Sequence, residues 1–354
     1  MTNSLLLDSD FDEILERLGE LTNEFAGKTI LFSGARGFIG RYIIELFHRM
    51  NEEILAKPAR VIAIDNLISS GIVGAQIPEK NGIEFVHHDV IEQYKYDGKL
   101  DFVVHAAGIA SPFYYRAYPM QTLEVAIHGT QNMLELAERC DAKLVFFSSS
   151  EIYGDPDPRH IPIPESYRGN VNCQGPRACY DESKRIGETL CYIYQTTFGT
   201  HTNTIRPFNI YGPGMQEKDY RVLPNFASRI KGGFPLQVYG TGDQTRTFCY
   251  ITDAIIGFFL VILKGVPGEA YNIGNPQPEI TMLDLVKRIE KITDCDLNFD
   301  IIEYPDSYPS DEPQRRVPDI RKANLQLQYS PQVDFDEGLR RFFSWSDQVY
   351  TGKI

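Results

Sequence analysis

Cysteine and basic residues are scarce in this sequence, and both shortages limit what the protein can do. The six cysteines show no C-x-x-C spacing, which argues against a zinc site and against the disulfide framework of a small secreted protein. Lysine and arginine number 35 against 48 aspartates and glutamates, which gives a formal net charge of −13 at pH 7. Such a charge disfavours non-specific binding to nucleic acid and to anionic membranes. We therefore expect a cytoplasmic protein with neither of these partners and with no metal.

Long apolar runs are missing as well. No segment reaches the roughly 20 apolar residues that a membrane-spanning helix needs. The first 25 residues are acidic and amphipathic, and they lack the basic start and continuous apolar stretch of a signal peptide. With 42% hydrophobic and 23% charged residues in 354, the composition is that of an ordinary globular protein. The length suffices for one large domain or two closely associated ones.

Apolar segments typical of strands alternate with amphipathic segments typical of helices over the first 210 residues. Strands are predicted near residues 29–33, 60–64, 83–87, 101–105, 143–148 and 202–206, and helices near 39–50, 118–140 and 181–198. This alternation predicts an α/β, Rossmann-type fold, in which a doubly wound parallel sheet carries helices on both faces. Beyond residue 214 the pattern is less regular, which predicts a smaller C-terminal α/β substrate lobe.

A glycine-rich turn follows the first predicted strand. The glycines Gly34, Gly37 and Gly40 have the spacing G-x-x-G-x-x-G, and an amphipathic helix begins beside the last of them. Such a turn lets the backbone approach a pyrophosphate, and the helix N-terminus offers unpaired N–H groups and a positive dipole end. Glycines alone also make ordinary turns, but the flanking strand and helix are the context that a dinucleotide site requires.

The second predicted strand ends in Asp65 and Asn66, roughly 25 residues beyond the last glycine, where a ribose-binding acid is expected. The carboxylate of Asp65 should accept hydrogen bonds from the adenosine ribose and repel a 2′-phosphate, which predicts NAD rather than NADP. The alternative is a strand-end aspartate that only caps a loop. We therefore assign residues 27–210 to an NAD-binding domain, residues 1–26 to a helical extension, and residues 211–354 to the substrate lobe, with the chain free to pass between lobes.

Tyr180 and Lys184 are four residues apart in a predicted helix and therefore share one face. A lysine ammonium favours the tyrosinate and can lower the pKa of the phenol, which suits acid–base catalysis. The lysine can also hold the nicotinamide ribose. Ser149 ends a predicted strand and could relay a proton between Tyr180 and a substrate hydroxyl. The alternative is ordinary surface packing of the tyrosine and the lysine.

Together these motifs resemble those of the extended short-chain dehydrogenases that act on nucleotide sugars. The resemblance rests on the glycine turn, Asp65-Asn66, His88-Asp89-Val90, His105-Ala-Ala-Gly108, Ser149, Tyr180-x-x-x-Lys184 and Arg206-Pro-Phe-Asn-Ile-Tyr-Gly-Pro213, and it spans about residues 28–345. It implies that NAD is held by Gly34, Gly37, Phe38, Ile39, Gly40, Asp65, Asn66, Asp89, Val90, Ala106, Gly108, Tyr180 and Lys184. It also implies a nucleotide-sugar-binding C-terminal lobe and a homodimer formed through the helices near 118–140 and 181–198. The apolar faces of these helices could equally belong to the core.

Further segments resemble UDP-glucuronate decarboxylases: Ser150-Glu151-Ile-Tyr-Gly-Asp-Pro156, Gly175-Pro-Arg-Ala-Cys-Tyr180, Gln244-Thr-Arg246 and Pro313-Gln-Arg-Arg-Val-Pro-Asp-Ile320. Related dehydratases carry Asp-Glu after the relay serine and epimerases usually carry small apolar residues, whereas this chain has Ser150-Glu151. The resemblance places Ser150 and Glu151 at the decarboxylation site and assigns Arg316 to the substrate carboxylate or to protonation at C5. A surface ion pair is the alternative for Arg316.

The resemblance also implies contacts to a UDP-sugar. Asn209 and Arg246 hold the diphosphate, the arginine as a two-pronged fork, and Arg221 adds charge there. Tyr239 lies in a segment that cradles the uracil, although the same segment could be an ordinary edge strand.

Some positions depart from the family pattern. Arg36 replaces a small residue in the glycine turn, and we expect its side chain to point to solvent rather than to a phosphate. Gln121 and Ala126 stand where lysine and asparagine are usual, and the 108–112 loop also differs. The sequence thus predicts NAD-dependent decarboxylation of UDP-glucuronate to UDP-xylose through a 4-keto intermediate. Its rivals are a 4-epimerase or other 4-keto-forming enzyme and, more remotely, a non-catalytic dinucleotide sensor, which would not need a proton relay.

Overall fold

A seven-stranded parallel sheet forms the centre of the protein, in a computed structural model that describes residues 5–70, 81–304 and 313–353. The strand order is β11-β6-β5-β4-β1-β2-β3, and every pairing is parallel. In chain order the strands are β1 (Thr29–Ser33), β2 (Arg60–Asp65), β3 (Ile83–His87), β4 (Phe102–His105), β5 (Lys143–Phe147), β6 (Thr202–Pro207) and β11 (Ala270–Ile273). The predicted α/β, Rossmann-type fold is therefore confirmed.

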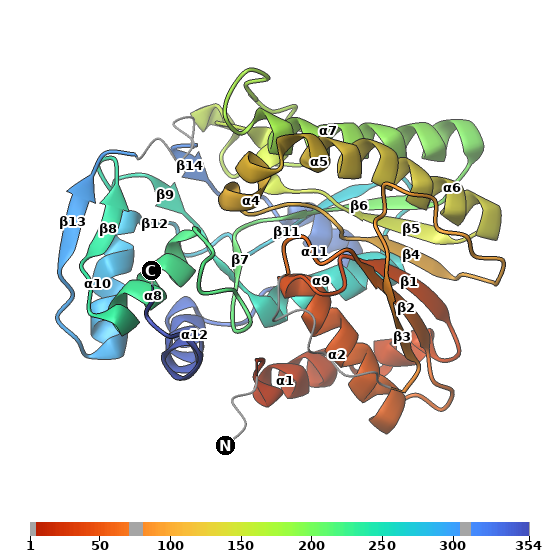
Figure 1. Ribbon diagram of the computed structural model, residues 1–354, viewed down its shortest axis with the longest axis horizontal. Coiled ribbons are helices and arrows are strands. Elements are labelled where there is room, and N and C mark those ends of the chain that lie inside the picture. Colours follow the sequence, from red (N-terminus) through yellow and green to blue (C-terminus); the bar gives the residue numbers. More distant parts are fainter. Residues whose placement is uncertain (1–4, 71–80, 305–312, 354) are drawn as a thin grey trace.

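Helices cover both faces of this sheet (Figure 1). One layer consists of α4 (Pro112–Ala117), α5 (Pro119–Glu124), α6 (Thr130–Cys140) and α7 (Ala178–Ile193), and the other of α1 (Asp8–Leu18), α2 (Phe38–Glu53), α9 (Ile251–Lys264) and α11 (Arg321–Leu327). The helix predicted over 118–140 is interrupted by a π-helical turn, Val125–Gly129. Gly129 packs so tightly on β-branched Val90 that a Cβ there would lie 2.8 Å from Val90 Cγ2. A second π-helical turn, Tyr194–Phe198, extends α7.

The other elements form a smaller lobe (Figure 1, left). They are β7 (Ile210–Tyr211), α8 (Val222–Gly232), β8 (Leu236–Tyr239), β9 (Thr245–Arg246), β10 (Cys249–Tyr250), β12 (Ile280–Thr281), α10 (Met282–Thr293), β13 (Phe299–Ile302), β14 (Arg315–Arg316) and α12 (Phe335–Val349). They pair as β10-β7, β12-β9-β14 and β13-β8. The chain passes between lobes, because α9 and β11 return to the central sheet before β12 begins.

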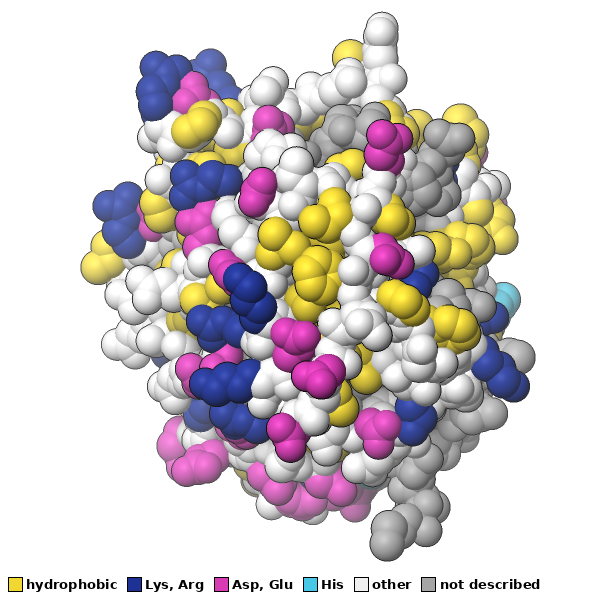
Figure 2. Space-filling model, turned by 90° about the vertical axis from the view of Figure 1, so that its left-hand side faces the viewer, with side chains coloured by type: hydrophobic (Ala, Val, Ile, Leu, Met, Phe, Trp, Pro, Cys, Tyr) yellow, Lys and Arg dark blue, Asp and Glu magenta, His cyan; other side chains and the backbone are white. Residues whose placement is uncertain are grey.

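The outer face of the small lobe is partly apolar. Figure 2 shows hydrophobic side chains gathered in the middle of this face, with charged side chains around them. The strand β13 contributes Phe299 and Ile301, which are 42% and 55% exposed. Its residues therefore lack the alternation of buried and exposed positions that makes a strand recognisable in a sequence.

The most apolar helix, α9, owes its composition to its position. All residues from Ile251 to Ile262 are buried, because α9 lies between the sheet and the helices α1, α2 and α11. Throughout the ranges that the structure covers, no helix combines the length and the apolarity needed to cross a bilayer.

The N-terminal extension consists of α1 and the 3₁₀ turn Gly19–Phe25. Its apolar side chains Phe11, Ile14 and Leu18 are at most 4% exposed. Asp10 is buried beside them and accepts hydrogen bonds from Tyr42 Oη of α2 (2.8 Å) and Tyr250 Oη of β10 (2.9 Å). Thus α1 contacts an element of each lobe.

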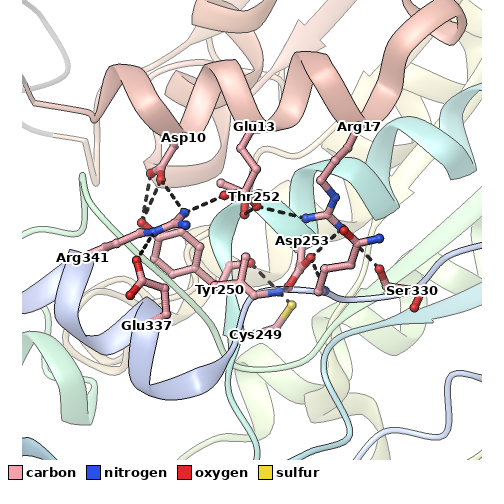
Figure 3. Close-up of polar contacts among 12 residues, drawn as sticks. Asp10, Glu13, Arg17, Cys249, Tyr250, Thr252, Asp253, Ser330, Glu337 and Arg341 are labelled. Carbon is pink, nitrogen blue, oxygen red and sulfur yellow. Dashed lines mark hydrogen bonds and ion pairs between the residues drawn. The ribbon is translucent and has the colours of Figure 1, made fainter.

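Charged groups reinforce this attachment (Figure 3). Arg341 Nη1 of α12 lies 2.6 Å from Glu13 Oε2 and 3.6 Å from Asp10 Oδ1. Arg17 Nη2 lies 2.7 Å from Oδ1 of the buried Asp253 in α9. These pairs fix α1 across the junction between α9 and α12.

Asp10→Asn is expected to remove a pH dependence from the free energy of unfolding. Burial raises the pKa of Asp10 from 3.8 to about 6. The folded state therefore binds the proton more tightly than the unfolded chain, so the stabilisation is full below the unfolded pKa and is lost as the pH rises through the folded pKa. The difference in the free energy of unfolding between wild type and variant should therefore be about 2 kcal/mol more favourable to the wild type near pH 4.5 than at about pH 7. Urea unfolding measures this, and an equal difference at both pH values would contradict it.

Candidate active site

The carboxyl ends of β1, β4 and β5 surround a pocket that suits a dinucleotide. The strands β1 and β4 are neighbours although β2 and β3 separate them in the chain, so the connections that leave them diverge and a crevice forms between them. The pocket is lined by predicted cofactor residues and the serine-rich strand end: Gly34, Gly37, Phe38, Ile39, Gly40, Ala106, Gly108, Ser148, Ser149, Ser150, Tyr180 and Lys184. An adjoining pocket shares Gly34, Gly37 and Gly108 with it and adds Asp65, Asn66 and Val90.

The backbone of the glycine turn leaves room for a pyrophosphate. Gly34 has φ of +78°, and a Cβ there would lie 2.8 Å from the Ala106 backbone. A Cβ at Gly108 would lie 3.0 Å from Lys184 Nζ, inside the pocket. The first backbone N–H groups of α2 follow directly after Gly37, and no side chain caps them. These features fit NAD, whose pyrophosphate needs close backbone approach at a helix N-terminus.

Asp65 stands at the end of β2 beside this turn. Its Oδ2 accepts a hydrogen bond from the Arg36 backbone N–H (2.8 Å), and its Oδ1 accepts one from the Leu67 N–H (2.7 Å). Asp89 does not line either pocket; its Oδ2 accepts from Asn66 Nδ2 (2.9 Å) and so orients the Asn66 amide. The carboxylate of Asp65 is thus held at the edge of the pocket, where a ribose could reach it.

The prediction that Arg36 points to solvent is wrong. Its side chain is 6% exposed, and the guanidinium carbon lies 3.7 Å from the centroid of the Phe85 ring of β3. Cation–π attraction and burial against β3 explain this position. The negative charge of Asp65 also acts on Arg36, so the two side chains lie near each other.

Asp65→Ser is expected to weaken NAD binding by about 10-fold or more, the usual effect of losing a hydrogen bond to a charged acceptor. The same change should strengthen NADP binding, because it removes a repulsive carboxylate and leaves the positive charge of Arg36 nearby. Fluorescence titration with both dinucleotides tests this, with exposed Asp97→Ser as the control variant. Wild-type affinity for NADP that equals or exceeds that for NAD would contradict the prediction.

Tyr180, Lys184 and Ser149 lie together at the inner end of the pocket. The phenol of Tyr180 is hydrogen-bonded to the Ser149 hydroxyl. Lys184 Nζ donates to the Phe147 carbonyl (2.8 Å) and lies 5.8 Å from the centroid of the Tyr180 ring. Both side chains of the pair are 7% exposed, which excludes surface packing.

The pKa of Tyr180 shifts opposite to the predicted direction. Burial raises it to about 12, and the hydrogen bond from Ser149 only partly offsets this. Burial also lowers the pKa of Lys184 to about 8. The reason is that the tyrosine and the lysine share one desolvated site, in which neither charged form is favoured by burial.

A buried ion cluster adjoins the tyrosine. Glu151 is held from both sides by arginines: Arg316 forms a two-pronged pair with it (Nη2 to Oε2, 2.6 Å), and Arg177 Nη2 bonds to the same Oε2. Arg316 is 2% exposed, which excludes the surface ion pair considered from the sequence. Arg177 Nε also lies 3.6 Å from Asp181 Oδ2. The cluster therefore balances the carboxylate of Glu151 with two guanidinium groups, and all three side chains line the pocket described next.

Sequence reasoning missed Arg177 as a site residue. It lies three positions before Tyr180, one helical turn away, and therefore on the same side of the chain. That spacing was the available signal. The motif Gly175-Pro-Arg-Ala-Cys-Tyr180 served only to support the resemblance.

The second large pocket opens from the first into the smaller lobe. The two share Glu151, Tyr180, Asn209 and Arg221, so ligands in them would meet at Tyr180. The other predicted substrate residues, Tyr239, Arg246 and Arg316, line the second pocket, together with Gln237, Val238, Gln244 and Tyr304.

Pairing of short strands positions the two buried arginines. Arg246 and Arg316 are register partners in β9 and β14, so their side chains emerge side by side. Arg246 Nη1 donates to the Thr245 carbonyl (2.8 Å), and Asn209 Nδ2 donates to the Thr247 carbonyl (2.8 Å). Arg221 instead forms an ion pair with Asp219 on the pocket wall.

Comparisons with known proteins agree with this site. Residues 30–274 match the NAD dependent epimerase/dehydratase family. The chain is 37% identical over 316 residues to UDP-glucuronic acid decarboxylase 1 of Xenopus tropicalis, covering 89% of this chain and 71% of that protein. It is 38% identical over 312 residues to UDP-glucuronic acid decarboxylase 5 of Arabidopsis thaliana, covering 88% and 86%.

A solved structure extends the similarity to the fold. A mutant of UDP-glucuronic acid 4-epimerase from Bacillus cereus, in complex with NAD and UDP-4-deoxy-4-fluoro-glucuronic acid, superimposes with a TM-score of 0.78 and 25% identity. The match covers 91% of this chain and 100% of that one. NAD is accordingly the cofactor of this chain. The chain is an enzyme and belongs to the NAD-dependent epimerase/dehydratase family of extended short-chain dehydrogenases.

Proposed function

We propose that this enzyme is a decarboxylase that converts UDP-glucuronate into UDP-xylose and CO₂. The observation that carries the proposal is the cluster in which Arg177 and Arg316 hold Glu151 beside the Tyr180–Ser149 pair. Guanidinium groups in a desolvated pocket attract a carboxylate, and a sugar acid brings one. The decarboxylases of Xenopus and Arabidopsis support the same assignment.

The proposed chemistry divides into three steps. Tyr180, in the deprotonated form that the positive charge of bound NAD⁺ would favour, first takes the proton of the sugar 4-hydroxyl through Ser149, which is hydrogen-bonded to it. Bound NAD⁺ supplies the hydride acceptor at C4 and later the hydride donor. The new 4-ketone lies beta to the carboxylate, so the C5–C6 bond breaks, CO₂ leaves, and the electron pair passes to the ketone oxygen. C5 then takes a proton from water on the side of Arg316, which re-forms the ketone, and Tyr180 returns its proton to O4 as this ketone is reduced.

A 4-epimerase is the second candidate. The solved epimerase from Bacillus cereus acts on the same sugar acid according to its name, and its fold superimposes on this chain. An epimerase would keep the carboxylate and invert C4. Glu151 favours decarboxylation, because this larger polar side chain, held by two arginines, leaves less room for the keto sugar to turn over. Ser150 beside it is polar rather than apolar and is buried in the dinucleotide pocket.

One assay separates these functions. Purified protein is incubated with UDP-glucuronate and NAD, and CO₂ and the nucleotide sugars are followed by mass spectrometry. The proposal expects one CO₂ for each UDP-pentose formed. A UDP-hexuronate with inverted C4 and no CO₂ would establish the epimerase instead.

The proposal includes a homodimer in the cytoplasm. Neighbouring helices expose an apolar face, to which α5 and the following π-helical turn contribute Met120 and Ile127, and α7 contributes Ile186, Tyr192 and Ile193. A second copy related by a two-fold axis would bury this face as a four-helix contact. All six cysteines are unpaired, which suits a reducing compartment. Light scattering of wild type and Ile193→Glu tests the dimer; a monomeric wild type would refute it.

A further inference from the structure

An aromatic stack joins the two lobes at the mouth of the active site. Phe113 of α4 and Tyr220, in the loop before α8, have ring centroids 5.4 Å apart and planes inclined by only 12°. The two side chains are 50% and 44% exposed. One aromatic ring belongs to the NAD-binding side and the other to the substrate lobe, and their sequence positions are more than one hundred residues apart.

The neighbours of both rings line the place where the two pockets meet. Pro112, Tyr220 and Arg221 line the substrate pocket, whereas Tyr114, Asp219 and Arg221 line the dinucleotide pocket. The stack therefore lies beside the junction of the pockets, at which Tyr180 stands.

The loop that carries Tyr220 is also attached to the NAD-binding side at its other end. Gln216 Nε2 donates to the Ser69 carbonyl (3.0 Å). The loop 216–221 thus forms a strap between two attachment points, and Phe113 supplies one of them.

The attachment at Phe113 is weak compared with the anchoring of α4 by Tyr115. Tyr115, two residues on, is 2% exposed and stacks on Tyr180, with ring centroids 5.4 Å apart. An exposed aromatic pair shifts a closed-to-open equilibrium by about 2- to 10-fold. The Phe113–Tyr220 contact can therefore open for substrate exchange while α4 stays in place.

In the proposed reaction, a closed Phe113–Tyr220 contact would be needed to retain an intermediate, and the inference rests on that proposed function. After CO₂ leaves, the sugar is a 4-keto pentose that no longer has the carboxylate bound by Arg316. It must stay until a hydride returns to C4 and Tyr180 returns a proton to O4. If it leaves earlier, the enzyme retains reduced cofactor and the released product is a ketone.

We propose that the stack of Phe113 on Tyr220 is a latch that retains the keto sugar until it is reduced. The latch thereby determines whether the enzyme releases the alcohol or the ketone. The two residues position the strap and take no part in bond making or breaking.

The test uses full-length enzyme with NAD and UDP-glucuronate. Mass spectrometry gives the ratio of keto pentose to reduced pentose, and near-ultraviolet absorbance gives the reduced cofactor left on the protein. Phe113→Ala, Tyr220→Ala and the double variant should each raise the ketone fraction by about 2- to 10-fold. The initial rate of CO₂ release by Phe113→Ala, whose side chain lines neither pocket, should stay close to that of the wild type. Because either single change already opens the latch, the double variant should match the single ones.

Two control variants make the test specific. Phe113→Tyr keeps an aromatic ring and should restore the wild-type ratio. Phe198→Ala removes a phenylalanine of similar exposure (54%) beyond α7 and should not change the ratio. CO₂ release with an unchanged ketone fraction in Phe113→Ala would overturn the latch alone. Absence of CO₂ from the wild type would overturn the proposed function and, with it, this task of the stack.

Discussion

Replacing Tyr180 with phenylalanine is expected to lower turnover by at least ~100-fold, the usual scale of general acid–base catalysis. The substitution keeps the ring, and with it the packing on Tyr115, but removes the hydroxyl that bonds to Ser149. No other phenol is hydrogen-bonded to Ser149 within the described part of the chain. The variant should therefore fold and bind NAD but fail to remove the proton from the sugar 4-hydroxyl.

A matched control lies on the same helix. Tyr192 is 67% exposed near the end of α7, and Tyr192→Phe makes the same chemical change away from the pocket. Its turnover should equal that of the wild type. If Tyr180→Phe kept near-wild-type turnover with UDP-glucuronate, Tyr180 would have no role in the proton transfer.

Local patterns in the sequence were sufficient for the sheet and the glycine turn. The strands near Thr29 and Arg60 are continuous apolar runs because a parallel sheet buries both of its faces, and such runs are visible without a structure. Gly34 needs a positive φ, a requirement that glycine alone meets cheaply. These features depend on neighbours in the chain and were therefore predictable.

Other features depend on contacts that a local pattern does not contain. The helix over 118–140 contains the π-helical turn Val125–Gly129, whose last residue packs against Val90 in the loop after β3. Arg36 turns away from solvent because Phe85, almost fifty residues later, offers it a ring face. The raised pKa of Tyr180 follows from how completely side chains such as Ile109 and Tyr115 bury it. A sequence states which residues are present but not how deeply tertiary packing desolvates them.

The ion cluster illustrates this limit best. The resemblance pointed to Glu151 and Arg316, yet nothing in their spacing indicates that β14 pairs with β9 and so sets Arg316 beside Arg246. Arg177 joins them from the start of α7, one turn before Tyr180. Two arginines from segments far apart in the chain thus converge on one carboxylate, and this convergence gives the site its expected preference for a sugar acid.

Arg316→Ala is therefore expected to abolish CO₂ release while the protein still folds and binds NAD. Removing one partner of a buried ion pair typically costs several kcal/mol of free energy. Here we expect most of this cost to appear as weaker binding of the substrate carboxylate. Glu151 keeps its bond to Arg177, so its charge is not left alone and the fold should survive. Affinity for UDP-glucuronate should fall by at least ~100-fold, whereas affinity for UDP-glucose, which lacks the carboxylate, should change little.

The neighbouring strand residue provides the control for this experiment. Arg315 is exposed in the same strand β14 and pairs with Glu279, so Arg315→Ala removes the same charge from the outer face of the lobe. Calorimetric titration measures the affinities for both nucleotide sugars, and CO₂ release is detected in parallel. Both quantities should be close to the wild-type values in Arg315→Ala. Equal losses of affinity for UDP-glucose and UDP-glucuronate in Arg316→Ala would mean that the arginine acts on the diphosphate or the fold. If Arg316→Ala still released CO₂, Arg316 would have no role in decarboxylation, because the substrate carboxylate would not depend on it.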